Sequence, residues 1–482
     1  MAGPAAAGSE PAAPPNLRVA VVGSGPAGLY TAEALIKQVA ARAGGPGVEV
    51  DVLDRLPTPY GLVRYGVAPD HTSIKSIAGY LQRVLEHPQV RFLGGVRFGT
   101  DVSREELLAC YDAVVYATGA MRDRRLGVPG EDLPGSVAAT DFVNWYCGHP
   151  DIDPAMFRLD AQAVAVIGVG NVAVDVARVL AKTAAELSHT DVPEPVLAAL
   201  AASKVRDIHM IGRRGPAQAK FTTKELRELG ELPGADIVVT PAEADLAAFD
   251  PTGASARLAE SDRHVRGNVA VIRDWAGRTP DGRPRRLSVR FWLKPVEIMG
   301  TERVTGLRLE RTGLDESGRV VGTGEYEVLP VQMVLRSVGY QSVPLPGVPF
   351  DERSATVPNA EGRVLGPEGT PRPGEYVAGW LKRGPTGVIG TNKSDAAQTV
   401  RTLLADLDGG PRSGAGTRPA RLRDVLAARG LRPVSYEDWL GIEKRELELG
   451  AELSRGERVK LCGWDALNAA CGIGSAATPD TS

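Results

Sequence analysis

Three glycines near the start of the chain have the spacing that binds a dinucleotide. Gly23, Gly25 and Gly28 follow the apolar run 19–22. In this pattern the first glycine permits a tight turn, the second lets the backbone approach a pyrophosphate, and the third lets a helix pack closely on the strand. The helix then offers free N–H groups and a partial positive charge to the phosphates. Asp54, at the end of the next apolar run, supplies a carboxylate for the ribose hydroxyls, so this stretch predicts a nucleotide site.

A second fingerprint has the same spacing but different chemistry beyond it. Gly168 and Gly170 follow another apolar run, and Ala173 stands in the third small position. The next strand ends without an acid, and Arg213 and Arg214 follow at once. A carboxylate there would repel a ribose 2′-phosphate, whereas guanidinium groups pair with it through parallel hydrogen bonds. The second site is therefore expected to prefer NADPH to NADH. The alternative is that both arginines belong to a solvated turn.

A third glycine-rich stretch, 376–395, combines a short strand, a glycine loop and an expected helix over 388–407. The start of that helix also offers N–H groups to an electron-rich ligand edge. With a flavin in the first site, this positive end is expected to face the pyrimidine ring and to stabilise the negative charge of the reduced form.

Two different fingerprints indicate two different dinucleotides. The economical assignment is FAD in the first site and NADP(H) in the second, because a flavin accepts a hydride from nicotinamide and passes electrons on singly. Disulfide reductases of this architecture also need neighbouring thiols. The four cysteines form no C-x-x-C motif and predict neither a redox dithiol nor a metal site; they are Cys110, Cys147, Cys462 and Cys471. Electrons are therefore expected to leave through the flavin edge to an external acceptor.

The elements that position these motifs indicate an α/β protein of two or three domains, since 482 residues are too many for one core. We expect an N-terminal tail (1–16), an FAD-binding domain in two parts (17–119 and 344–472, the latter with C-terminal helices), an inserted NADP-binding domain (120–343) and a frayed tail (473–482). Further expectations are a helix over 74–85, a strand over 90–96, an antiparallel flap within 235–330 that includes 287–293, a closing strand over 331–340, and helices from about 421 onward.

Composition narrows the function class. The formal net charge of −3 argues against a nucleic-acid-binding protein, which would carry a strong basic excess. No apolar run approaches the roughly 18–20 residues that span a membrane. Residues 1–16 lack the basic start and apolar centre of a signal peptide and the arginines of a transit peptide, so a cytoplasmic protein is expected.

Taken together, the motifs resemble the adrenodoxin reductase family, the glutathione-reductase-like ferredoxin–NADP+ reductases of mitochondria and bacteria. The likeness extends from about residue 18 to about residue 470, and two runs are highly specific to that family. They are Tyr-Gly-Leu-Val-Arg-Tyr-Gly-Val-Ala-Pro-Asp-His (60–71) and Gly-Pro-Thr-Gly-Val-Ile-Gly-Thr-Asn (384–392). The resemblance implies a bacterial member with two Rossmann-like domains of three-layer ββα type and NADPH-dependent ferredoxin reductase activity.

The resemblance also implies residue roles. The expected FAD-binding residues are Gly23, Gly25, Ala27, Gly28, Asp54, Leu62, Val96, Trp380, Gly387, Val388 and Ile389. The expected NADP(H)-binding residues are Gly168, Gly170, Asn171, Val172, Ala173, Arg213, Arg214, Glu225 and, near the flavin, Gly387. Many members carry glutamate where this chain has Asp54, and the shorter acid is still expected to reach the ribose. His71 and Glu228 match a histidine and a glutamate that are thought to assist near the nicotinamide. The alternative is that His71 only holds its long loop, because stacking and distance carry most of a hydride transfer.

The expected partner is an acidic ferredoxin, an iron–sulfur protein that would feed a cytochrome P450 or a biosynthetic enzyme. Seven basic residues and two acids between 204 and 227 leave a net charge of +5 there. Such a patch steers an acidic partner, and the association rate then falls with salt. The alternative is a solvated helix face beside the two cofactor arginines.

Three rival functions remain open at this stage. A flavin monooxygenase would form a stable oxygenated flavin and hydroxylate a substrate. An electron-input subunit, such as the small chain of glutamate synthase, normally brings cysteine clusters that this chain lacks. A nucleotide-binding redox sensor would bind cofactors tightly but turn over no acceptor.

Overall fold

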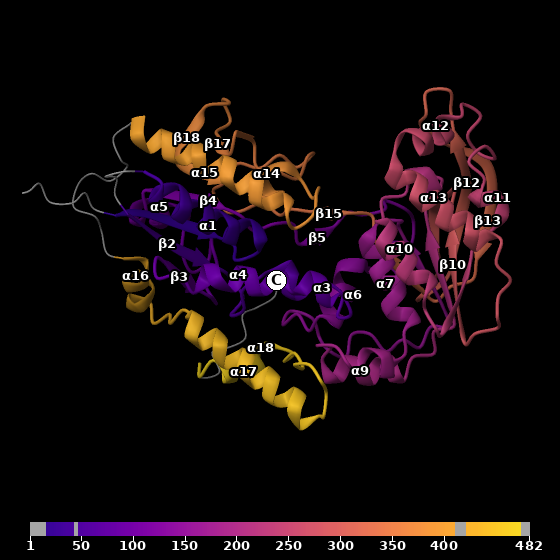
Figure 1. Cartoon of the computed structure of the whole chain (residues 1–482), viewed down its shortest axis with the longest axis horizontal. Helices are drawn as coiled ribbons and strands as arrows, with labels where there is room; N and C mark the ends of the chain where they lie inside the picture. Colours follow the sequence, from indigo (N-terminus) through magenta and orange to yellow (C-terminus); the bar gives the residue numbers. More distant parts are fainter. Residues whose placement is uncertain (1–15, 43–46, 410–420, 474–482) are drawn as a thin grey trace, which may run out of the picture. The chain divides into compact units, whose positions relative to one another are not determined.

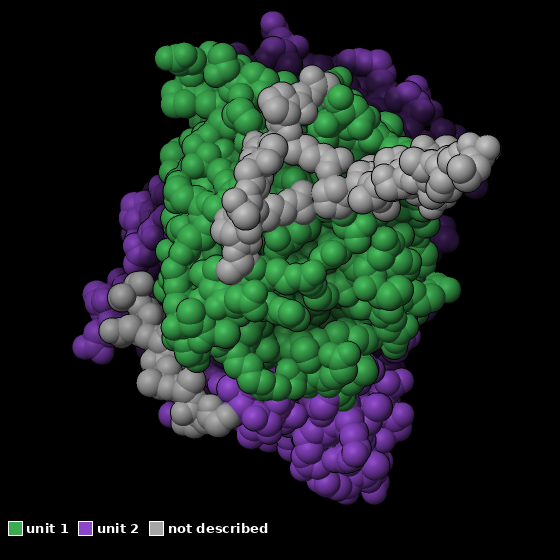
Figure 2. Space-filling view, turned by 90° about the vertical axis from the view of Figure 1, so that its left-hand side faces the viewer, with its two compact units in different colours: residues 1–63, 76–120, 342–440 green, residues 64–75, 121–341, 441–482 purple. Residues whose placement is uncertain are grey.

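The computed structural model describes residues 16–42, 47–409 and 421–473. Apart from residues 16 and 473, the expected tails at 1–16 and 473–482 lie outside the described residues. The chain forms two compact units, which Figure 2 colours separately. Unit 1 comprises Met1–Val63, Ser76–Ala120 and Ser342–Leu440, and unit 2 comprises Arg64–Lys75, Met121–Gln341 and Gly441–Ser482. The expected domain boundaries stay a prediction.

Unit 1 is built on a seven-stranded sheet in the order β16-β17-β18-β4-β1-β2-β3 (Figure 1). Its strands are β1 (Leu17–Val22), β2 (Val48–Leu53), β3 (Val90–Leu93), β4 (Ala113–Tyr116), β16 (Asn359–Ala360), β17 (Arg363–Leu365) and β18 (Pro371–Val377). The pairs among β3, β2, β1, β4 and β18 are parallel, and β16 and β17 add an antiparallel edge. Strands β1 and β4 are buried along their whole length, which is typical of parallel strands covered on both faces.

Helices cover both faces of this sheet. α1 (Pro26–Ala40) packs against α4 (Ile77–Leu85) and α15 (Thr391–Gly409). On the opposite face, α5 (Arg104–Cys110) and α16 (Leu422–Ala428) contribute Leu107, Leu422 and Leu426 to one apolar cluster with β1 and β4. The remaining helix is α14 (Trp380–Arg383), while α2 (Leu62–Tyr65) and α17 (Tyr436–Glu452) contribute residues to both units.

Unit 2 contains a six-stranded sheet in the order β6-β14-β7-β8-β10-β9, and every pair in it is parallel. Its strands are β6 (Ser136–Ala138), β7 (Ala163–Ile167), β8 (Asp207–Ile211), β9 (Ala235–Val238), β10 (Arg285–Arg290) and β14 (Met333–Arg336). The helices are α3 (Thr72–Lys75), α6 (Ala139–Tyr146), α7 (Asn171–Ala181), α8 (Ala184–Leu187), α9 (Glu194–Ala201), α10 (Thr223–Gly230), α11 (Pro241–Ala244), α12 (Ala254–Ser261), α13 (Arg263–Ala276), α18 (Trp464–Ala470) and the 3-10 turn η1 (Pro216–Gln218).

An antiparallel sheet of β11 (Leu293–Gly300), β12 (Val304–Leu314) and β13 (Val320–Leu329) follows β10. Apolar side chains of β11 and β12 form one core cluster with those of β7, β8 and β14. The short strands β5 (Arg122–Asp123) and β15 (Tyr340–Gln341) pair antiparallel. The flap is therefore attached to the nucleotide-binding sheet by shared apolar packing.

The extent of the flap was predicted wrongly. Only 293–329 is antiparallel flap, because β10 pairs in parallel with β8 and β9 inside the main sheet. Most of 254–276 is helical: Asp262 caps α13 by accepting from two backbone N–H groups, and Val269, Ile272 and Trp275 recur on its buried face. The expected helix over 74–85 is two helices, α3 and α4, and the strand expected over 90–96 ends at Leu93.

The C-terminal segment belongs to unit 2 through buried charge pairing. Glu446 of α17 accepts hydrogen bonds from the Arg64 guanidinium at 3.1 and 2.5 Å, and from the Leu461 backbone N–H at 3.0 Å. The Lys460 ammonium donates to the Arg64 carbonyl at 2.6 Å. Burial alone would lower the pKa of Arg64, but Glu446 holds that pKa above its ordinary value. Removing either partner would leave an unpaired buried charge.

Candidate nucleotide-binding sites

The first glycine turn, in unit 1, joins β1 to α1 as the spacing predicts. Gly23 has φ +114°, and a Cβ added to it would lie 2.5 Å from the Ala117 carbonyl oxygen. A Cβ on Gly28 would lie 1.8 Å from the Gly23 carbonyl oxygen, so the helix packs directly on the turn. Gly25 is the N-cap of α1 and offers no side chain to its first N–H groups. The helix start is therefore left to bind an anion.

Asp54 lies beside this turn. Its Oδ2 accepts from the Ser24 N–H at 2.9 Å and from the Ser24 hydroxyl at 2.5 Å, while Oδ1 accepts from the Leu56 N–H at 3.0 Å. Three of roughly four acceptor positions on the carboxylate are used, which leaves one for a hydroxyl. Val96, which is buried, donates its N–H to the Asp54 carbonyl at 2.9 Å. Asp54 thus ties the glycine turn to the end of β2.

Two further segments of unit 1 meet the turn. Tyr60, at φ +81°, donates its N–H to the Ser24 carbonyl at 3.1 Å, which brings Gly61, the residue before Leu62, alongside Gly25. A Cβ on Gly379 would lie 2.4 Å from the Ala27 Cβ, so the loop before Trp380 lies against α1.

The late glycine loop of unit 1 continues from Trp380 to α15. Gly387 has φ +83°, and the Val388 N–H donates to the Thr391 hydroxyl at 3.2 Å. Val388 is exposed and Ile389 is half-buried. The helix begins at Thr391, three residues later than expected.

The second glycine turn, in unit 2, joins β7 to α7. Gly168 has φ +139°, and a Cβ on it would lie 2.2 Å from the Ser337 carbonyl oxygen. Gly170, the N-cap of α7, has no atom of the described chain within 4 Å of an added Cβ, so this side of the turn is open. Asn171 accepts the Thr222 N–H at 2.9 Å, which fixes the first residue of the helix to the start of α10. Val172 is half-buried and Ala173 is buried.

Arg213 and Arg214 follow β8 and are exposed. Neither forms an ion pair with a carboxylate of the described chain. Just before them, a Cβ on Gly212 would lie 2.8 Å from a Val169 methyl, and the Gly168 N–H donates to the Ile211 carbonyl at 2.8 Å. The arginine loop therefore borders the second glycine turn, as the 2′-phosphate hypothesis requires.

A buried acid–base cluster lies in the same unit. The His71 Nε2 is 2.8 Å from the Asp175 carboxylate, whereas Nδ1 is 3.9 Å from the Glu228 carboxylate. Arg178 bridges Asp175, at 2.8 Å, and Asp70, at 2.8 Å. Burial alone would raise the pKa of Asp70, but hydrogen bonds from Arg178 hold it well below its ordinary value. The cluster fixes the imidazole through Nε2 and leaves Nδ1 toward Glu228.

Glu225 lies on α10 near this cluster. Its Oε2 is buried without a hydrogen-bond partner among the described residues. Burial, and then the charge of Asp175, raise its pKa. A buried carboxyl oxygen without a partner is typical of a group that binds a ligand.

Asp70, Asp175 and Arg178 were not among the residues predicted from the sequence. Asp175 and Arg178 are three residues apart on α7 and therefore share one helix face, which was a readable signal. Asp70 adjoins His71 in a run that had already been singled out. The sequence does not predict that the run 60–71 contacts α7.

The open helix starts, the close-packed glycines and the spare acceptor on Asp54 fit two dinucleotides. None of the four cysteines, all of which lie in the described part of the chain, forms a disulfide. Within residues 16–42, 47–409 and 421–473, no group of three or more His, Cys, Asp or Glu side chains is placed to hold a metal ion. None of the described helices is both long and apolar enough to cross a membrane.

Comparisons with known proteins agree with this geometry. Residues 17–226 match the family model described as pyridine nucleotide-disulphide oxidoreductase. The chain is 45% identical over 453 residues to the NADPH-ferredoxin reductase FprA of Mycobacterium tuberculosis, which covers 92% of this chain and 96% of that protein. It is 40% identical to the mitochondrial NADPH:adrenodoxin oxidoreductase of Arabidopsis thaliana, over 94% and 95% of the two chains.

A solved structure extends the likeness to three dimensions. The structure of Mycobacterium tuberculosis FprA in complex with NADPH superposes with a TM-score of 0.88 at 44% identity, covering 95% of this chain and 99% of that one. This similarity confirms the expected fold class: α/β, with two dinucleotide-binding domains of the glutathione-reductase-like type.

Proposed function

This chain belongs to the NADPH-ferredoxin reductase family that includes FprA and adrenodoxin reductase, and from that premise we propose that it passes electrons from NADPH through FAD to a ferredoxin-type iron–sulfur protein. Its cofactors are FAD and NADP(H). When bound, the flavin accepts a hydride from the nicotinamide and releases electrons singly. The protein's own part is to bind, orient and shield the two groups.

One observation carries the proposal: the two glycine turns differ in the chemistry of the strand end beside them. Asp54 presents a carboxylate acceptor at the first turn, whereas Arg213 and Arg214 present guanidinium groups at the second that no carboxylate of the described residues pairs with. A carboxylate suits free ribose hydroxyls, and guanidinium groups suit a 2′-phosphate. Two such sites on one chain support an enzyme that takes NADPH in unit 2 and keeps a flavin in unit 1.

We assign the binding roles accordingly. FAD is held by the turn residues Gly23, Gly25, Ala27 and Gly28, by Asp54, Leu62 and Val96, and by the loop residues Trp380, Gly387, Val388 and Ile389. NADP(H) is held by Gly168, Gly170, Asn171, Val172, Ala173, Arg213, Arg214 and Glu225. The open starts of α1 and α7 support both pyrophosphate assignments.

His71 and Glu228 are assigned catalytic roles near the nicotinamide. The Asp175 carboxylate holds His71 at Nε2, so Nδ1 is the atom that can hold or move a proton toward Glu228. Asp175 itself is fixed by Arg178, which keeps the imidazole in one orientation. A group whose position is fixed in this way contributes through placement, and hydride transfer is sensitive to placement.

The partner is an acidic ferredoxin that feeds a cytochrome P450 or a biosynthetic enzyme, and the reaction takes place in the cytoplasm. Support for the docking face comes from exposed cations between 204 and 227, of which Lys220 and Lys224 are examples. Lys204 is partly neutralised by Asp160 at 3.3 Å. Exposed charges steer association more than they add affinity, so the effect should appear in the on-rate.

The test is NADPH-dependent reduction of cytochrome c by the FAD-loaded protein with and without an added acidic ferredoxin. We expect the rate to rise at least about tenfold with ferredoxin and to fall as salt is raised, since exposed charge pairs are screened. Direct reduction of an uncharged quinone at saturating NADPH, which needs no docking protein, is the control and should change little with salt. A rate of cytochrome c reduction that changes with neither added ferredoxin nor salt would refute a ferredoxin-type acceptor.

A further inference from the structure

The Arg213–Arg214 loop is joined to the segment that links β10 to β11. The Gly212 N–H donates to the Arg290 carbonyl at 2.8 Å, and the Leu293 N–H donates to the Gly212 carbonyl at 3.0 Å. The Trp292 N–H donates to the Arg214 carbonyl at 3.3 Å. The backbone that carries the two arginines is therefore hydrogen-bonded along its length to residues about 80 positions later.

The Trp292 side chain packs against the Arg213–Arg214 loop at Gly215. The side chain is fully buried, and a Cβ added to Gly215 would lie 2.2 Å from the Trp292 Cζ2. The Phe249 ring packs beside the indole with centroids 5.7 Å apart. Any side chain at position 215 would push the loop off the indole. The height of the arginine loop above the sheet is thus set by contact with one ring.

Two unfavourable features are concentrated in Trp292. Its backbone has φ +60°, in the left-handed region that L residues rarely adopt. Its Nε1 is buried with no hydrogen-bond partner among the described residues. Strained or unsatisfied groups persist where the surrounding structure requires them, and they cluster at binding sites. The indole therefore contributes through its packing and not through a hydrogen bond.

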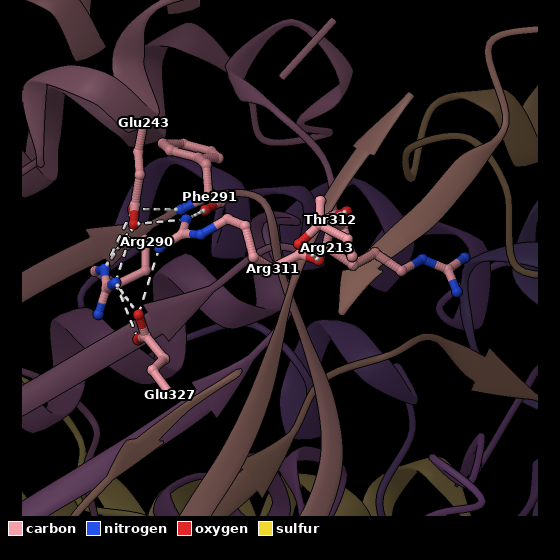
Figure 3. Close-up of polar contacts among 8 residues, drawn as sticks. Arg213, Glu243, Arg290, Phe291, Arg311, Thr312 and Glu327 are labelled. Carbon is pink, nitrogen blue, oxygen red and sulfur yellow. Dashed lines mark hydrogen bonds and ion pairs between the residues drawn. The ribbon is translucent and has the colours of Figure 1, made fainter. Parts of the chain in front are cut away.

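Thr312 of β12 fixes the loop from the other side. Its hydroxyl donates to the Arg213 carbonyl at 3.0 Å, and its N–H donates to the Trp292 carbonyl at 2.9 Å. The side chain is fully buried. Figure 3 shows Thr312 next to Arg213, whose guanidinium points away from the carboxylates of Glu243 and Glu327. Thr312 therefore holds the backbone of Arg213 and leaves its charge free.

That charged cluster anchors the linking segment. Glu243, which is buried, accepts from the Phe291 N–H at 2.9 Å and from Arg290 and Arg311 at 2.9 and 3.0 Å (Figure 3). Glu327 joins the same two arginines at 3.0 and 3.3 Å. Burial alone would lower the pKa of Arg290, but Glu243 raises it. Both arginines are thus occupied by carboxylates, in contrast to Arg213.

We propose that Trp292 and Thr312 are positioning residues that set the place of the Arg213–Arg214 loop and thereby the selectivity of the second site for a nucleotide 2′-phosphate. The inference rests on the proposed function, because it concerns the same NADP(H) site. Both side chains are fully buried. They act through the backbone of Arg213 and Arg214.

The experiment measures binding rather than turnover. Isothermal titration of the FAD-loaded protein with adenosine 2′,5′-bisphosphate and with 5′-AMP gives two Kd values, and their ratio is the contribution of the 2′-phosphate. For Thr312→Val, which replaces the hydroxyl with a methyl group of similar size, we expect this ratio to fall about 2- to 12-fold, the worth of one net hydrogen bond. The Kd for 5′-AMP should change less than about twofold, and Thr312→Ser should restore the ratio.

Two further variants complete the design. Trp292→Phe removes the part of the ring that reaches Gly215, and we expect a fall in the ratio of similar size. If that variant does not fold, the Thr312 pair carries the test. Thr305→Val is the matched control, since Thr305 is on the same strand and bonds the Met299 carbonyl at 3.3 Å, away from the arginine loop. It should leave the ratio unchanged.

The outcomes separate the two hypotheses. A wild-type protein that binds both probes equally refutes NADPH recognition, and with it the proposed function. A wild-type preference that survives intact in Thr312→Val and in Trp292→Phe overturns the positioning role alone. Equal losses for both probes also overturn it, because they indicate general loosening of unit 2 rather than a displaced phosphate site.

Discussion

Removing both guanidinium groups from the second site is the most direct perturbation of nucleotide choice. In the variant R213A/R214A the loop keeps its backbone contacts, because these involve main-chain carbonyl groups and not the deleted side chains. A charge-assisted hydrogen bond contributes about 1.5–3 kcal/mol. Both arginines are exposed, so the lower end applies to each, and together they give about 3 kcal/mol. Since 1.4 kcal/mol is a tenfold change, kcat/KM for NADPH should fall about 150-fold.

The assay is steady-state reduction of ferricyanide at fixed ionic strength, with NADPH and NADH as alternative donors. NADH lacks the 2′-phosphate, so its kcat/KM should fall less than about threefold. The control variant K204A/R206A removes an equal number of positive charges, two, from elsewhere in the same unit. It should leave the NADPH to NADH ratio within about twofold of the wild type, because long-range charge effects are largely screened at physiological salt.

Equal losses for the two donors would refute the assignment. Such a result would mean that the arginines support the unit generally or shape a part of the site common to both nucleotides. A loss in K204A/R206A as large as that in R213A/R214A would point to bulk electrostatics. In either case the contrast between the two glycine turns would no longer support the choice of NADPH.

Three other predictions concern separate parts of the chain. Asp54→Ala removes the tie to the glycine turn and the spare ribose acceptor, so the FAD content of the purified protein should drop below about half, by flavin absorbance; full occupancy would contradict the ribose role. Asp175→Asn loosens His71 at Nε2, and stopped-flow flavin reduction by NADPH should slow about 3- to 10-fold with little change in the Kd for NADP+; an unchanged rate would remove the positioning role. Burial lowers the pKa of His209 to about 4 from its ordinary value of 6.5. The unfolded chain therefore binds more protons between these values, and the free energy of unfolding should fall by about 2 kcal/mol between pH 6.5 and 4.5. His209→Gln should abolish that part of the loss in chemical denaturation, and an identical pH dependence would show that another group is responsible.

The glycine turns could be predicted because their requirements are local. Gly28 is needed for its close approach to the Gly23 carbonyl, five residues earlier, and Gly23 for a φ of +114° at the turn. The same holds for Gly168, whose φ is +139°. A motif of this kind carries its geometry with it, so residue types and spacing are sufficient.

The strand β10 could not be assigned in the same way. Residues 285–290 alternate in sequence like a flap strand, but both of their faces are covered, and their partners β8 and β9 are parallel. Which sheet an apolar strand joins depends on pairing with residues distant in the chain, and periodicity does not encode that choice. Helix α13 was missed for a related reason, since only its cap at Asp262 is a local signal.

In the acid–base cluster, the sequence predicts which residue has a function but not which residue orients it. His71 and Glu228 were both expected near the nicotinamide, and the shorter contact of His71 is with Asp175, at 2.8 Å, rather than with Glu228, at 3.9 Å. The ranking of these two carboxylates depends on how the loop before α3 meets α7. No spacing rule relates position 71 to position 175, so a motif can name the imidazole but not the group that orients it.

The arginine pair extends the same argument to specificity. Arg213 and Arg214 identify the charge that a 2′-phosphate requires. The same prediction would be made for any chain with two arginines after the strand that corresponds to β8. Parallel hydrogen bonds from a guanidinium to a phosphate need both distance and orientation to be right, and the backbone sets the point from which the side chain reaches. Here the holding groups are the indole of Trp292 and the hydroxyl of Thr312, about 80 and 100 residues later. If nucleotide choice depends on them, a change of cofactor preference in this fold need not touch the arginines: it can arise from a single methyl-for-hydroxyl exchange in the flap.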